Sequence, residues 1–93
     1  MRIVGYIEHP DMKITVFRMD NKISLKFETG LYEQTFKFRE TEELSTMEQI
    51  EKLVTGEFAQ RVLENFGKMH TMKNDALFEF LPKTRRDEFE EII

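Results

Sequence analysis

The fold is decided by residues 12–39, MKITVFRMDNKISLKFETGLYEQTFKFR, in which apolar and polar side chains alternate. A period of two is typical of β-strands that bury one face. Within this stretch Ile23, Leu25 and Phe27 alternate with polar neighbours without interruption. The pattern therefore predicts antiparallel strands that share one apolar face.

Two short breaks in the alternation predict how the strands pair. Asp-Asn at 20–21 and Thr-Gly at 29–30 are two-residue loop candidates, because these residue types tolerate positive φ angles. The first loop places Met19 opposite Lys22. The second loop sets three pairs: Glu28 with Leu31, Phe27 with Tyr32, and Ile23 with Phe36. Both hairpins then place one apolar set on the same side: Ile14, Val16, Ile23, Leu25, Phe27, Tyr32, Phe36 and Phe38.

The remaining sequence extends this core to a single α+β domain, residues 1–93. Residues 2–8, RIVGYIE, are rich in β-branched side chains and precede a break at His9-Pro10. We expect Ile3 and Ile7 on one face of this strand, with Val4 and Tyr6 on the other. The prediction is a four-stranded antiparallel β-meander with strands at about 2–8, 12–19, 22–28 and 31–39. Three to four helices, at about 46–55, 57–66, 74–81 and 85–93, are expected to pack on one face.

Sequence signals for the helix ends are of unequal strength. Ser45 and Glu48 have the spacing of a capping box, and Gly67 is placed to end a helix at Phe66. Gly56 favours two helical segments over one long helix. Residues 68–73 are expected to form a loop, and 76–81 fit either a helix or a strand.

Composition narrows the chemistry that the chain can perform. Its 93 residues carry a net charge of −4 and contain no cysteine. Thiol nucleophiles, cysteine zinc sites and disulfides are therefore excluded. No stretch approaches the ~18 apolar residues of a membrane span, and the N-terminus does not resemble a signal peptide. We expect a cytoplasmic protein that does not enter membranes.

The sequence contains no recognisable catalytic motif. There is no G-x-S-x-G, S-x-x-K, Walker-type or G-x-G-x-x-G pattern. Glu8, His9 and Asp11 place two carboxylates and an imidazole in one loop, which could bind a metal, but an ordinary turn is the favoured interpretation. His70 is interpreted as a surface loop residue. We assign no catalytic, cofactor-binding or metal-binding residue and lean against an enzyme.

The second face of the sheet provides the candidate binding residues. Phe17, Lys22, Lys37 and Arg39 form an aromatic-and-cation set that suits a partner or a single-stranded nucleic acid. The predicted register opposes Lys13 to Glu28 and Lys26 to Glu33, which neutralises other cations and makes a solvated face the favoured interpretation.

Apolar side chains also lie on this second face. Val4, Tyr6, Phe17, Met19 and Leu31 suggest a second apolar patch. The face is expected to be open, covered by a late segment of the chain such as 76–93, or paired with another chain.

Two polar residues fall on the apolar face. Arg18 is near a strand end, where its side chain can extend to solvent. Gln34 is expected opposite Leu25, with its amide bonded to backbone beneath a helix.

Three functional hypotheses follow from these observations. The leading one is a non-enzymatic protein-interaction or regulatory module that acts as a homodimer, with another protein as a further partner. The alternative is a single-stranded nucleic-acid-binding module using the outer face of the sheet, and a small hydrolase or metal-dependent enzyme around His9 and Asp11 comes last.

Overall fold

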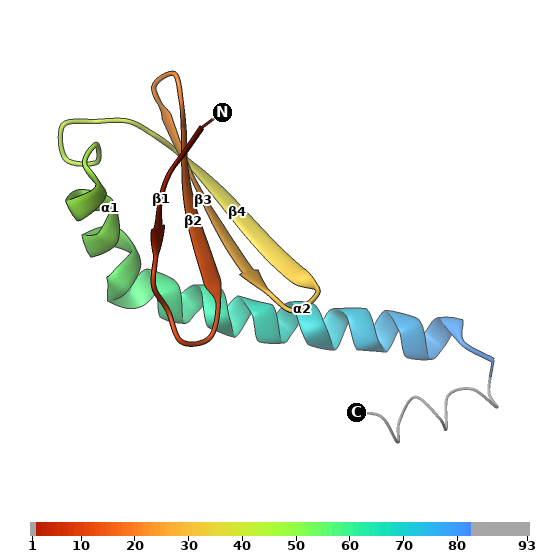
Figure 1. The fold of residues 1–93 in the computed structure, drawn as a ribbon. Coiled ribbons are helices and arrows are strands. Elements are labelled where there is room, and N and C mark those ends of the chain that lie inside the picture. The colour runs from red at the N-terminus through yellow and green to blue at the C-terminus, as the bar shows by residue number, and fades with distance from the viewer. Residues whose placement is uncertain (1, 83–93) are drawn as a thin grey trace. The chain divides into compact units, whose positions relative to one another are not determined.

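The computed structural model describes residues 2–82, and the chain divides after Leu63 into two compact units. The first unit contains a four-stranded antiparallel sheet in the order β1-β2-β3-β4 (Figure 1). The predicted α+β meander is confirmed. The strands are β1 (Arg2–Ile7), β2 (Lys13–Met19), β3 (Lys22–Thr29) and β4 (Tyr32–Arg39).

The β2–β3 hairpin has the predicted register. Met19 pairs with Lys22 and Val16 with Leu25, so the loop is Asp20-Asn21. Asp20 has a φ of 55°, the left-handed conformation that a short Asp side chain tolerates.

The β3–β4 hairpin differs from the prediction. Its loop is Gly30-Leu31, because Thr29 pairs with Tyr32 and Phe27 with Gln34. Gly30 has a φ of 55° and occupies the first loop position, as Asp20 does in the other hairpin. When the loop moves by one residue, the β4 partner of every β3 residue moves by two positions. Since side chains alternate with a period of two, the predicted apolar face is retained although the predicted pairs are wrong.

The helices of the first unit begin after a polar link. Helix α1 (Met47–Leu53) is followed by a π-helical turn, η1 (Val54–Phe58), and by the long helix α2 (Ala59–Phe80), which belongs to the first unit only as far as Leu63. Gly56 has non-helical backbone angles, φ −80° and ψ −143°, so the predicted break at this residue is confirmed. No helix among residues 2–82 combines the length and the apolar composition needed to cross a membrane.

The core of the first unit lies between the inner face of the sheet and these helices. An edge-to-face aromatic cluster forms its centre: the Phe58 ring lies 5.3 Å from Phe27, 5.1 Å from Phe36 and 6.1 Å from Phe38. The side-chain amide of Gln34 donates a 3.0 Å hydrogen bond to the carbonyl of Val62, which confirms its expected role beneath a helix. The other buried apolar side chains of this unit are Ile7, Met12, Ile14, Val16, Ile23, Leu25, Ile50, Val54, Ala59 and Val62, and the polar side chains of Thr15 and Ser24 are buried as well.

Several helix predictions are wrong. The predicted helices 57–66 and 74–81 belong to one helix, α2, so residues 2–82 form fewer separate helices than predicted and the loop at 68–73 does not exist. Gly67 has no positive φ and lies inside α2. The segment 76–81 is not a strand, because α2 extends through it to Phe80. The predicted helix 85–93 lies outside the described residues.

The N-cap of α1 is Thr46, one residue after the predicted Ser45. The Thr46 hydroxyl accepts a hydrogen bond from the Gln49 amide at 3.2 Å, and the Gln49 side chain accepts one from the Thr46 amide at 3.0 Å. The capping box therefore uses Gln49 in place of Glu48. Ser45 is engaged elsewhere, because its hydroxyl donates to Glu40.

Candidate functional site: the outer face of the sheet

The outer face of the sheet carries exposed apolar side chains. Ile3, Tyr6 and Met19 expose 49%, 57% and 45% of their surface, while Phe17 is half-buried between neighbouring strands. These four residues are called the outer patch below. Ile3 pairs with Phe17, and Met19 follows Phe17 on the same face, so three of the four are immediate neighbours.

A β-bulge in β1 corrects the predicted orientation of Ile3. The register shifts between Ile3 and Gly5, which inserts Val4 as an extra residue and reverses the parity of the strand. Ile3 therefore shares the outer face with Tyr6 and not the inner face with Ile7. Gly5 faces inward, where the side chain of Met47 occupies the space that a Cβ atom would take.

The structure brings the four predicted site residues together at one end of the outer face. Phe17 pairs with Ser24, and Ser24 pairs with Lys37 on the far strand. In the adjacent row, Lys22 pairs directly with Arg39. Like charges in directly opposed positions destabilise a ladder. Among residues 2–82, no ion pair neutralises these three cations, so this end of the face attracts anions.

The other end of the face is electrostatically balanced. The Lys26 ammonium lies 3.2 Å from Glu33 and 3.9 Å from Glu28. The hydrogen bond with Glu33, and then the charges of both carboxylates, raise the pKa of Lys26. The prediction that Lys26 opposes Glu33 is wrong, because Lys26 pairs with Thr35. Their ion pair nevertheless forms along the diagonal of the ladder.

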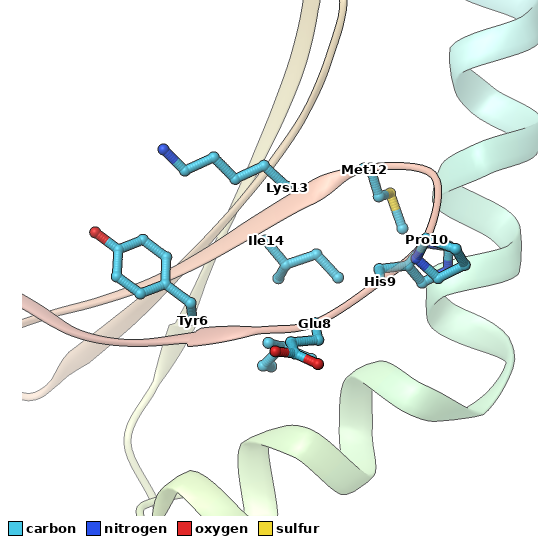
Figure 2. A pocket seen from close by; sticks show the side chains of 8 residues that line it. Tyr6, Glu8, His9, Pro10, Met12, Lys13 and Ile14 are labelled. Carbon is cyan, nitrogen blue, oxygen red and sulfur yellow. The ribbon is translucent and has the colours of Figure 1, made fainter.

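A shallow hollow of about 590 Å³ surrounds the end of the β1–β2 hairpin. Figure 2 shows Tyr6 and Lys13 toward one end and His9 and Pro10 in the turn at the other. The Lys13 ammonium lies 5.7 Å from the centre of the Tyr6 ring, a cation–π contact. The residues that line the hollow are Tyr6, Ile7, Glu8, His9, Pro10, Met12, Lys13 and Ile14.

The two histidines lie in separate local hydrogen-bonded arrangements within residues 2–82. His9 Nδ1 accepts a 3.1 Å hydrogen bond from the Asp11 backbone amide, which is the geometry of a closed turn. His70 lies in α2 and not in a loop, and its Nε2 is 2.9 Å from the side-chain amide of Asn74. Residues 2–82 contain no group of three or more His, Asp or Glu side chains that could hold a metal ion.

Sequence reasoning missed a polar cluster at the sheet–helix junction. Arg18 Nη1 donates to Glu40 Oε2 at 2.6 Å, and Nη2 donates to the carbonyl of Ser45. The Ser45 hydroxyl donates to the same Glu40 oxygen at 2.8 Å. The hydrogen bond from Ser45, followed by that from Arg18, lowers the pKa of Glu40. Instead of extending freely to solvent, Arg18 fixes the link between β4 and α1.

The signal for this cluster was present in the sequence. Arg18 was placed on the apolar face, where a guanidinium needs an acceptor. Glu40 is two residues after Phe38 and continues the same face beyond the end of β4. The parity rule that identified the core would also have identified this partner.

The chain matches no family model, no curated protein and no solved structure.

Proposed function

We propose that this chain is a non-enzymatic protein-interaction or regulatory module that acts as a homo-oligomer. The observation that carries the proposal is the outer patch, in which Ile3, Tyr6 and Met19 expose about half of their surface beside Phe17. Adjacent exposed apolar side chains are typical of surfaces that meet another protein. The proposal includes the cytoplasmic location expected from the cysteine-free sequence.

The inner face supports the same assignment, because its side chains already have partners within the protein. Its aromatic cluster, the Gln34 amide and the Arg18 guanidinium all have partners within residues 2–63. Within the strands of the sheet, the exposed large apolar side chains are those of the outer face, Ile3, Tyr6 and Met19.

The mass of the full chain in solution tests this proposal. Light scattering coupled to size exclusion, between about 1 and 100 µM, is expected to give a multiple of the 11.2 kDa chain mass. The mass should fall toward that of one chain on dilution, as mass action requires. A chain that stays monomeric over the whole range contradicts the proposal.

Single-stranded nucleic acid is the second candidate partner, because Phe17, Lys22, Lys37 and Arg39 gather in two adjacent rows. Stacking on the one ring and phosphate contacts to three cations would give weak, salt-sensitive binding. The first proposal is preferred because Ile3 and Met19, beside this ring, are not aromatic.

Fluorescence anisotropy with a labelled single strand tests the second candidate. Binding should fall when salt is raised from 50 to 200 mM, and Phe17→Ala should weaken it further at constant salt. An oligonucleotide that does not bind at 50 mM salt eliminates this candidate.

A further inference from the structure

The two edges of the sheet are not equivalent. Strand β1 has six residues and is interrupted by the bulge at Val4, a feature that protects edges from pairing. Strand β4 has eight residues and pairs with β3 without interruption. Within the described chain, β4 is therefore the edge better suited to add another strand.

The register identifies which backbone groups face outward along β4. Tyr32 pairs with Thr29 across a two-residue loop, and such closing pairs are hydrogen-bonded. The same parity continues to Glu40, whose amide donates to the carbonyl of Asn21 at 2.7 Å. Even-numbered residues thus bond to β3. The outward amides and carbonyls belong to the odd-numbered residues: Glu33, Thr35, Lys37 and Arg39.

The charges along β4 are complementary to those of a second copy of the strand that runs in the opposite direction. The carboxylate of Glu33 lies near the start of β4, and the cations Lys37 and Arg39 lie near its end. An antiparallel copy of the strand presents its carboxylate to these cations. A parallel copy in register would oppose each charge to itself, which destabilises a ladder.

We propose that β4 is a homodimer interface, in which the strands of two copies pair antiparallel and join their sheets. Thr35 of one copy faces Thr35 of the other, and each Glu33 faces Lys37 across the ladder. This register meets the parity requirement, because Glu33, Thr35 and Lys37, which would form the hydrogen-bonded pairs, all have outward backbone groups. The inference rests on the proposed homo-oligomer and assigns the contact between the two copies to the β4 edge, which leaves the outer patch as a surface for another protein.

The inner row of β4 gives the pairing an apolar component. Phe36 and Phe38 are half-buried, and each contacts the Phe58 ring from one side. In the proposed register, Phe36 lies opposite Gln34 and Phe38 opposite Tyr32 of the second copy. The aromatic layer of each protomer then continues into its neighbour, which buries the part of these rings that the single chain leaves exposed.

Charge reversal in the full chain tests the proposal. Glu33→Lys and Lys37→Glu are each expected to weaken the dimer about tenfold or more, because two opposite-charge pairs become like-charge pairs. The combined variant, E33K/K37E, should recover most of the wild-type dissociation constant in sedimentation or light scattering. The intrachain Lys26–Glu33 ion pair is lost in the double variant as well, so recovery cannot come from that contact.

A single introduced cysteine tests the register, since the chain has none of its own. Opposed residues of a hydrogen-bonded antiparallel pair have Cα atoms about 5.5 Å apart, within disulfide reach. Thr35→Cys should form a covalent dimer under mild oxidation. Ile3→Cys, on the opposite edge and in the outer patch, is the matched control and should stay monomeric on a denaturing gel.

The outcomes separate this inference from the proposed function. If the wild-type chain is monomeric at all concentrations, both the β4 interface and the proposed homo-oligomer are refuted. If it dimerises but neither charge reversal weakens it, or the double variant shows no recovery, the β4 interface is wrong while the homo-oligomer stands. Dissociation by the double variant Ile3→Ser with Met19→Ser, and not by changes in β4, would assign the interface to the outer patch.

Discussion

Replacing Phe58 by leucine should destabilise the first unit measurably, although most of the apolar area is retained. The Phe58 ring makes edge-to-face contacts with Phe27, Phe36 and Phe38 at 5.1–6.1 Å. Each such pair contributes about 0.5–1.5 kcal/mol beyond the burial of area. Because one half-buried ring serves all three pairs, we expect a total loss near the lower limit, about 1.5–2 kcal/mol.

The assay is urea unfolding followed by circular dichroism at one fixed protein concentration. The midpoint should fall while the slope m stays constant, since the surface exposed on unfolding is almost unchanged. In thermal unfolding the same loss corresponds to a fall in Tm of roughly 6–16 °C. Phe80→Leu is the matched control, because Phe80 is 83% exposed and its replacement should change stability by less than about 0.5 kcal/mol.

A double-mutant cycle shows whether the ring contacts themselves cause the loss. Phe27→Leu combined with Phe58→Leu should give a coupling energy of about 0.5–1.5 kcal/mol. If Phe58→Leu is as mild as Phe80→Leu, or if the coupling is zero, the aromatic cluster does not hold the helices against the sheet and the reasoning is refuted.

Three further predictions concern a turn, a cap and a carboxylate. Gly30→Ala should cost about 1–2 kcal/mol in urea unfolding because the φ of 55° disfavours a side chain, whereas Gly30→Asn should cost less. Thr46→Ala should cost about 1 kcal/mol through loss of the N-cap of α1, and an unchanged midpoint would contradict the assigned cap. Hydrogen bonds from Ser45 and Arg18 lower the pKa of Glu40 below 4.5, so their stabilisation is present above the unfolded-state pKa and is lost as pH falls through the folded-state pKa. The stability difference between the wild type and Glu40→Gln should therefore shrink from pH 6 to pH 3, and a constant difference would refute this.

The apolar face could be predicted because it depends on parity alone. Thr29-Gly30 and Gly30-Leu31 differ as loops by one residue, so every β3–β4 pair moves by two and each side chain keeps its face. The actual loop depends on which residue takes positive φ. Both hairpins place that residue first, Asp20 and Gly30, a regularity that residue types alone do not reveal.

The helix boundaries were harder to predict because weak local preferences compete. Gly67 resembles a helix terminator, but glycine within a helix costs only about 1 kcal/mol. The following residues, KMHTMK, include no proline, and Lys and Met are good helix formers. Helix α2 therefore continues through Gly67. At Gly56 the chain does leave helical geometry, and this places Phe58 against the three rings of the sheet.

The outer face was predicted in part, because a bulge leaves no trace in an alternating pattern. Val4 as the extra residue moves Ile3 to the face of Phe17, so the outer patch contains Ile3, which the sequence pattern placed on the inner face. Phe17, Lys22, Lys37 and Arg39 share the outer face because they lie on strands whose parity the sequence determined.

The opposed cations at one end of the sheet connect the outer face to the β4 edge. Lys22 faces Arg39, and this pair weakens the isolated sheet. The carboxylate of Glu40 does not offset the charges of Lys22 and Arg39, because it is bound by Arg18 on the inner face. In the proposed β4 pairing, Glu33 of the second copy lies opposite Lys37 and diagonal to Arg39, within the reach of long side chains. One pairing would thus both satisfy the outward backbone groups of β4 and supply a carboxylate to the cations that gather next to that edge.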